Sequence, residues 1–207
     1  MLASTSLRRR VAVALIALAP LAAGCRQSPE PAAVPAAHAD ALALQTFDIG
    51  GDFELQAHTG QPFKLSDLRG RVVLLFFGYT YCPDVCPTTL STMAQVQRLL
   101  GPDADRVTSL FVSIDPERDD AERLREYIGH FEARTIAVTG SKEQLDGVVK
   151  QYGAYYEKVA SDSATSYTVD HTSRLYLIDT KGRLRYLFRY GDEPKVIAEG
   201  VTLALRE

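Results

Sequence analysis

Two cysteines four residues apart, Cys82 and Cys86, are the side chains of this 207-residue chain best suited to chemistry. They lie in the segment Tyr79-Thr80-Tyr81-Cys82-Pro83-Asp84-Val85-Cys86-Pro87, between an apolar run and a helical pattern. Side chains four positions apart lie on one side of a helical turn, and a nearby helix N-terminus stabilises thiolate over thiol. Two close thiolates form a soft donor set, which selects Cu(I), zinc or iron–sulfur centres. The pair therefore predicts a metal or redox site.

The two thiolates need a further ligand, and His171 is the best candidate. A structural zinc site normally takes four protein ligands, but the only other cysteine, Cys25, lies near the N-terminus. His171 comes just before a strand expected to lie beside the first apolar strand. Two thiolates and one imidazole make a three-coordinate site that suits Cu(I), and an added water or carboxylate could extend it for Cu(II). Asp84 and Asp170 are expected to orient His171 or adjust the charge of the site.

Each of these residues also has a plainer interpretation. Cys82 and Cys86 could form a structural disulfide in an oxidising compartment. Because a four-residue link closes a small loop and stabilises little, we favour a reactive pair that forms a disulfide reversibly. His171 could be a structural histidine. The remaining histidines are expected on the surface: His38, His58 and His130.

The segments around these residues alternate between strand and helix patterns. Residues 72–77 form a continuous apolar run, typical of a strand buried on both faces. The cysteines follow this strand directly, and ligand sites of α/β sheets lie at the carboxyl ends of strands. The expected order is a hairpin over 52–65, a strand over 72–77, a helix over 87–100, a strand over 107–114, a helix over 119–131, a strand over 135–138, a helix over 141–152, a strand over 154–159, a polar stretch over 161–168, a hairpin over 174–190 and a helix over 194–205.

This order predicts an α/β fold. Alternating strands and helices imply parallel strands joined by right-handed crossovers, and the closing strand–strand–helix unit adds antiparallel strands. We expect a thioredoxin-like sheet with an N-terminal β-hairpin extension and inserted elements. The polar stretch before His171 leads us to expect a histidine that is mobile until metal arrives.

The N-terminus resembles the leader of a bacterial lipoprotein. Arg8, Arg9 and Arg10 precede an apolar run over 11–19 that is too short to span a bilayer. The sequence Leu21-Ala22-Ala23-Gly24-Cys25 is similar to a lipobox, which implies lipidation of Cys25. An uncleaved anchor, or an ordinary signal cut near residues 37–39, is the alternative.

The chain divides into a signal peptide over 1–24, a disordered membrane tether over 25–44 and a folded domain over 45–207. The tether is dominated by alanine and proline and has no periodicity. The formal net charge is −3, and removal of the leader leaves 20 basic against 26 acidic residues. A chain with this balance and no basic stripe is not expected to bind nucleic acid.

The motif over residues 78–87 is followed along the chain by Ser113-Ile114-Asp115-Pro116-Glu117-Arg118-Asp119, Val169-Asp170-His171-Thr172 and Tyr176-Leu177-Ile178-Asp179. Together these segments resemble the motifs of the Sco/SenC family, and the resemblance extends over about residues 45–205. The resemblance implies a copper chaperone that helps to assemble the binuclear copper centre of cytochrome c oxidase, with a thiol–disulfide role as a second activity. It implies as partner the copper-site subunit of the oxidase or another periplasmic copper protein. From the lipoprotein-type leader we expect the protein in the bacterial cell envelope, lipid-anchored, facing the periplasm or the outer side of the cytoplasmic membrane.

Three functions remain open at this point. The first is a copper chaperone, the second a thiol–disulfide reductase that keeps a partner's copper-ligand cysteines reduced, and the third a redox or copper sensor. Thioredoxin-type enzymes carry a cis-proline before the strand that faces the cysteine motif, whereas this chain has no proline between Pro116 and Pro194. His171 and Thr172 stand in the comparable place. This difference favours metal binding over enzymatic exchange.

Overall fold

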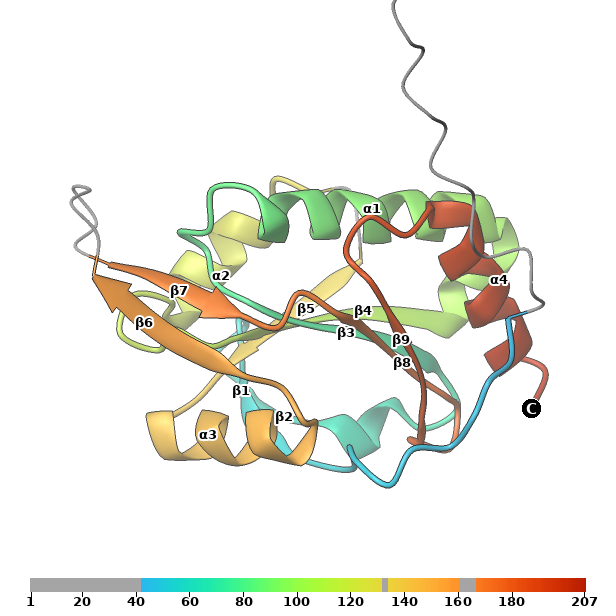
Figure 1. The fold of residues 1–207 in the computed structure, drawn as a ribbon, viewed down its shortest axis with the longest axis horizontal. Coiled ribbons are helices and arrows are strands. Elements are labelled where there is room, and N and C mark those ends of the chain that lie inside the picture. Colours follow the sequence, from blue (N-terminus) through green and yellow to red (C-terminus); the bar gives the residue numbers. More distant parts are fainter. Residues whose placement is uncertain (1–41, 132–133, 161–166) are drawn as a thin grey trace, which may run out of the picture. The chain divides into compact units, whose positions relative to one another are not determined.

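The structure is a computed structural model, and it describes residues 42–131, 134–160 and 167–207. Its main sheet has seven strands in the order β2-β1-β5-β4-β3-β8-β9, and β6 and β7 form a separate two-stranded sheet (Figure 1). The bounds, in chain order, are β1 Glu54–Ala57, β2 Pro62–Lys64, η1 Leu65–Leu68, β3 Val72–Gly78, α1 Val85–Leu100, η2 Gly101–Arg106, β4 Val107–Ser113, α2 Ala121–Ile128, β5 Thr135–Thr139, α3 Lys142–Gln151, β6 Tyr156–Ala160, β7 Tyr167–His171, β8 Leu175–Ile178, β9 Leu184–Phe188 and α4 Pro194–Ala204.

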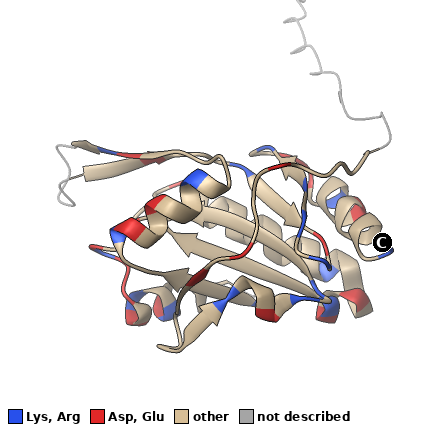
Figure 2. Ribbon diagram, turned by 90° about the horizontal axis from the view of Figure 1, so that it is seen from below, with Lys and Arg blue, Asp and Glu red and all other residues tan. Residues whose placement is uncertain are grey.

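Strands β3 and β4 form the centre of the sheet because neither contains a charged residue. All seven residues of each strand are buried. The two strands pair in parallel with Phe76 opposite Phe111, and β8 pairs antiparallel with the other edge of β3. Figure 2 shows the charged residues gathered on helices, turns and strand ends. The core is thus built around the strand that leads into the two cysteines.

Helices cover both faces of the sheet. Phe76 and Phe111 share one face, where Phe111 contacts Tyr127 of α2 with ring centroids 5.9 Å apart. Phe77 points to the opposite face, where it contacts Tyr152 at the end of α3. Helix α1 packs against α4 (Figure 1). This arrangement confirms the α/β thioredoxin-like fold with its N-terminal hairpin.

The structure departs from the sequence predictions in two places that matter for the site. Helix α1 begins at Val85, two residues before the predicted start, so Cys86 lies in its first turn. The predicted polar stretch, for which no strand was expected, ends with Tyr167 and Thr168, and these two residues begin strand β7. A short strand with alternating polar residues has little periodic signal of its own, and β7 is fixed by pairing with β6.

The predicted signal peptide, the lipidation site Cys25 and most of the predicted tether lie outside the described residues. The described part starts at Leu42, which packs with Leu44 against the hydrophobic core. Within residues 42–131, 134–160 and 167–207, none of the helices combines the length and apolar character needed to cross a membrane.

Candidate metal centre

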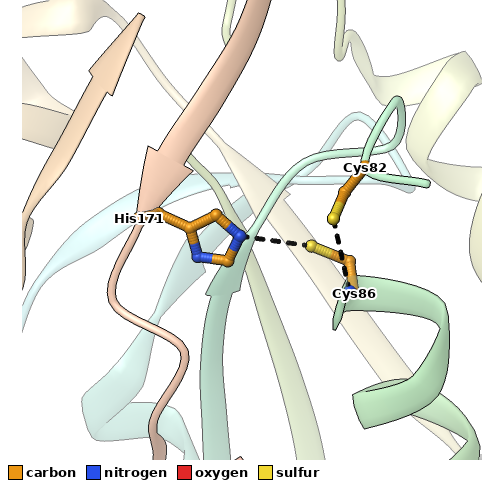
Figure 3. Close-up of side chains that lie close together, drawn as sticks. All are labelled: Cys82, Cys86 and His171. Atoms are coloured by element: carbon orange, nitrogen blue, oxygen red, sulfur yellow. Dashed lines mark hydrogen bonds between the residues drawn. The ribbon is translucent and has the colours of Figure 1, made fainter. Parts of the chain in front are cut away.

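Cys82, Cys86 and His171 come together at the carboxyl end of β3 (Figure 3). Their potential ligand atoms all lie within 4.8 Å of one another. The Cys86 sulfur is 3.5 Å from Nε2 of His171, and the backbone N–H of Cys86 donates to the Cys82 sulfur at 3.4 Å. Residues 85 positions apart in the chain thus form one cluster of two sulfurs and one ring nitrogen.

The cysteine side of the cluster is fixed by close packing at the end of β3. Gly78 is the last residue of the strand, and Cys86 is fully buried in the first turn of α1. A Cβ at position 78 would lie 2.8 Å from the Cys86 sulfur, 2.7 Å from Phe111 and 2.9 Å from Phe76. Only glycine allows this approach. The buried thiol therefore lies against the strand with no room to move toward it.

His171 is held by its ring and by its backbone. Its ring meets the rings of Phe76 and Tyr79 edge-on, each at 5.9 Å between centroids. Its Nδ1 is 3.2 Å from the carbonyl oxygen of Thr172. Because a carbonyl oxygen only accepts, we assign the proton to Nδ1, which leaves the Nε2 lone pair facing the cysteines. This is the tautomer that a metal ligand requires.

The pKa values of the two thiols are shifted in opposite directions. The side-chain hydrogen bond with Cys86 contributes most to lowering the pKa of the Cys82 thiol, and contacts with His171 and backbone N–H groups add to it. These effects outweigh burial and bring that pKa to about 4. Burial first, and then the hydrogen bond and charge of Cys82, raise the pKa of Cys86 far above its usual range. At neutral pH the metal-free pair therefore carries one negative charge, on Cys82.

The cluster is open on one side. Cys86 is buried, whereas Cys82 and His171 are each partly exposed. Both cysteines are free thiols in this structure. An ion or a partner thiol can therefore reach the cluster from the side of Cys82.

The two carboxylates predicted to support the site both lie on the surface. Asp84 is the N-cap residue of α1, and its carboxylate accepts a long bond of 3.5 Å from Tyr190. Asp170 lies opposite Glu157 in the β6–β7 pair. Since neighbouring side chains of a strand point to opposite faces, the Asp170 carboxylate points away from the face that His171 uses. The orienting contact to His171 comes instead from the Thr172 carbonyl.

Sequence reasoning gave no role in the site to the loop that joins β4 to α2. Asp119 in this loop is buried and accepts hydrogen bonds from the backbone N–H of Thr80 at 2.9 Å and from the Thr80 hydroxyl at 2.7 Å. Burial raises the pKa of this carboxyl. The loop thus holds the residues that lead into Cys82. The available signal was the presence of Asp115, Arg118 and Asp119 within a few residues of the end of an apolar strand.

The comparison with protein families gives one match over almost all of the described chain. The family model described as SCO1/SenC matches residues 42–206. An SCO2-like protein of Rickettsia felis is 38% identical over 152 residues, which is 73% of this chain and 74% of that protein. The human mitochondrial SCO1 homolog is 37% identical over 76% of this chain and 53% of its own length. This chain therefore spans about half the length of that mitochondrial relative.

Solved structures with the same fold include copper-bound proteins. The copper-bound structure of ScoI from Bradyrhizobium japonicum has a TM-score of 0.70 and 36% identity, and the match covers 75% of this chain and 99% of that one. The copper-bound ScoI of Arabidopsis thaliana has a TM-score of 0.71 and 31% identity, with 76% and 98% of the chains covered. The residues matched by the family model, 42–206, include Cys82, Cys86 and His171.

Proposed function

This chain belongs to the SCO1/SenC family, and from that membership we propose that it binds copper and takes part in the assembly of cytochrome c oxidase. The copper ligands in this proposal are the sulfurs of Cys82 and Cys86 and Nε2 of His171. The observation that carries the proposal is the convergence of these three atoms within 4.8 Å at the carboxyl end of β3.

The donor set fits copper better than a structural zinc ion. Two sulfurs and one imidazole are soft to intermediate donors, which copper accepts. A structural zinc site takes four protein ligands, whereas the group of potential ligands in the described residues has three members. Binding would displace the proton that the pair retains on Cys86, so copper uptake should release protons.

Copper is here the cargo. The partial exposure of Cys82 and His171 supports transfer to a partner that approaches from that side, since an incoming ligand can replace one of the three. We propose as recipient the copper-site subunit of cytochrome c oxidase or another periplasmic copper protein.

Anchoring to the cell envelope is part of the same proposal. Lipidation of Cys25 would hold the domain at the membrane, facing the periplasm or the outer side of the cytoplasmic membrane. Changing Cys25 to Ser should then release or misprocess the protein. Cell fractionation tests this, and an unchanged membrane fraction for the variant would contradict it.

Thiol–disulfide reduction is the second candidate function, and the asymmetry of the thiols favours it. Cys82 is a partly exposed thiol of low pKa, suited to attack a partner's disulfide. Cys86 lies buried behind it and could resolve the mixed disulfide. This activity needs both thiols but not an imidazole ligand.

A comparison of His171→Ala with Cys82→Ser separates the two functions. Each variant is placed in a strain that lacks the protein, at limiting copper, and oxidase activity is measured. Copper delivery requires that both variants fail. A nearly normal His171→Ala strain beside a failing Cys82→Ser strain would show that reduction is what the cell needs.

A further inference from the structure

The two halves of the metal centre belong to different parts of the fold, and one loop contacts both. The cysteines follow β3, whereas His171 ends β7 in the separate two-stranded sheet. The loop over residues 114–120 joins β4 to α2. We propose that Arg118 in this loop is a positioning residue, which sets the place of His171 by fixing the far end of β7. The inference rests on the proposed copper site.

The loop is first locked to the cysteine half. Asp119 accepts two hydrogen bonds from Thr80, and a third from the Ser113 hydroxyl at 2.7 Å. Asp115 and Asp119 are both fully buried. Bonds made to a buried carboxylate are strong and directional, so the residues between these two aspartates have a fixed position relative to the Cys82 loop.

Arg118 then holds β7 at Tyr167, the first residue of the strand. Its guanidinium lies 3.6 Å from the centre of the Tyr167 ring, and Nη1 donates to the Tyr167 carbonyl at 3.1 Å. Nε of Arg118 donates to the Asp115 carboxylate, whose other oxygen accepts the Tyr167 hydroxyl at 2.7 Å. Each of Arg118, Asp115 and Tyr167 is hydrogen-bonded to the other two, and we call these three residues the Tyr167 clamp.

The clamp acts on His171 through the geometry of the strand. Tyr167, Val169 and His171 alternate along β7 and therefore share one face. At the start of the strand Tyr167 is bound by Arg118 and Asp115. In the middle, the N–H of buried Val169 donates to the Tyr79 hydroxyl at 3.2 Å. At the end, Nε2 of His171 lies 3.5 Å from the Cys86 sulfur. Four residues of extended chain span about 13 Å, so a tilt at Tyr167 shifts the imidazole at the other end.

The β6–β7 pair needs such support because it has little of its own. A two-stranded ribbon is marginally stable alone, and four of the five residues of β6 are exposed. An exposed ion pair of Lys158 with Glu117 lies on the outside of the clamp. Surface pairs of this kind contribute little. Arg118, whose side chain is mostly covered and whose carboxylate partner is fully buried, is thus the stronger link between this sheet and the body.

Lysine cannot replace arginine in this place. The planar guanidinium stacks on a ring while its edge donates to two acceptors, and here it also lies 4.8 Å from the ring of Tyr81, the neighbour of Cys82. Arg118→Lys keeps the positive charge but loses the stacking and one of the bonds. It is therefore the variant that tests position and leaves charge unchanged.

Cu(I) affinity of the full protein, measured by competition with a coloured chelator under reducing conditions, tests the proposal. Arg118→Lys should weaken binding by about 10-fold, the lower end for residues that orient a ligand. When His171 is already changed to Ala, adding Arg118→Lys should weaken Cu(I) binding by less than a further factor of about 2, because effects that act through a common residue are not additive. A merely structural role would weaken both backgrounds equally.

Arg106 supplies a matched control. Its guanidinium also pairs with a carboxylate three residues earlier, Asp103, and bonds a distant carbonyl, that of Leu205 at 3.1 Å. It lies in η2, before β4, whereas Arg118 follows that strand. Arg106→Lys should change Cu(I) affinity by less than about 2-fold, which controls for the loss of one guanidinium.

Hydrogen exchange gives a second measurement without metal. The Val169 amide should exchange faster in Arg118→Lys, while amides of β3 keep their rates. If Arg118→Lys does not fold, Tyr167→Phe serves instead, since it removes only the hydroxyl, with its bond to Asp115 at 2.7 Å and its longer contact with Glu117 at 3.5 Å. We expect about 3-fold weaker copper binding from that variant, again only when His171 is present.

The outcomes separate this inference from the proposed function. Equal affinities of the wild type and His171→Ala would overturn the ligand set itself. A clear loss in His171→Ala, combined with wild-type affinity and exchange in both Arg118→Lys and Tyr167→Phe, would leave copper binding in place and overturn the clamp. Arg118→Lys that weakens Cu(I) binding equally with and without His171 would also overturn the clamp.

Discussion

The cysteine half and the histidine half of the centre are held by different kinds of structure. Cys86 is buried against Gly78 at the end of a strand whose seven residues are all buried. His171 ends a strand of a two-stranded sheet whose partner strand is largely exposed. The position of the thiols thus follows from the core of the domain, whereas the position of the imidazole depends on a few side-chain contacts. Damage to the first half should lower stability, and damage to the second should lower affinity alone.

Oxidation of the cysteine half should have the largest effect. A disulfide between Cys82 and Cys86 leaves neither sulfur able to bind copper as a thiolate, so Cu(I) affinity should fall by more than the roughly 100-fold upper range for changes beside a ligand. His171→Ala should also lose affinity, but the two thiolates that remain should still bind copper. Titration of reduced, oxidised and His171→Ala protein compares the halves directly. Equal affinity of oxidised and reduced protein would contradict the site.

A methyl group at Gly78 should disturb the core beneath the cysteine half. Gly78→Ala places its Cβ under 3.0 Å from Cys86, Phe111 and Phe76, and overpacking of this kind costs about 1–3 kcal/mol. Urea unfolding should show the loss. Gly147→Ala is the control, because a Cβ there meets no atom within 4 Å. An unchanged midpoint for Gly78→Ala would mean that the strand end is less tightly packed than described.

The cluster of candidate ligands and the fold class could be predicted from the sequence because both leave local patterns. Two cysteines at helical spacing follow an apolar strand, and His171 precedes the strand that pairs with β3. The Tyr167 clamp could not be predicted, since it joins Arg118 to a residue 49 positions away. Likewise, Arg185 alternates with apolar residues yet is buried. It pairs there with Asp179 beside an irregularity in the β8–β9 register.

The Asp179 network offers a prediction for a region remote from both halves. Burial alone would raise the pKa of the Asp179 carboxyl, but bonds from Arg183, Arg185 and the N–H of Lys181 outweigh it and hold that pKa below its usual range. Asp179→Asn should therefore destabilise the domain by about 1–2 kcal/mol at pH 7 and leave Cu(I) affinity unchanged.

The sign of the pH dependence follows from the lowered pKa. The stabilisation that charged Asp179 contributes is complete above about pH 3.9, the ordinary pKa of an aspartate, and is lost as the pH falls through the lower pKa of the folded state. The difference in unfolding free energy between wild type and Asp179→Asn should therefore narrow below about pH 3.9. Urea titrations at pH 7 and pH 3 measure it, and a difference that stays constant would exclude a charged Asp179 as its source.

The smallest effect is expected on the outside of the histidine half, at the pair of Lys158 with Glu117. The Nζ and Oε1 atoms are 2.6 Å apart, and this pair holds the pKa of Glu117 below its usual range. Because the carboxylate is exposed, water and salt screen the attraction. Lys158→Gln should therefore weaken Cu(I) binding by less than about 2-fold in dilute buffer, and the difference should vanish in about 0.5 M salt.

Arg118→Lys should keep its larger effect at both salt concentrations, because the guanidinium is mostly covered and its carboxylate partner is fully buried. If Lys158→Gln instead matched Arg118→Lys and lost its effect in salt, the histidine half would be held by surface charge. In that case the ion pair of Lys158 with Glu117, and not the Tyr167 clamp, would be the contact that positions His171.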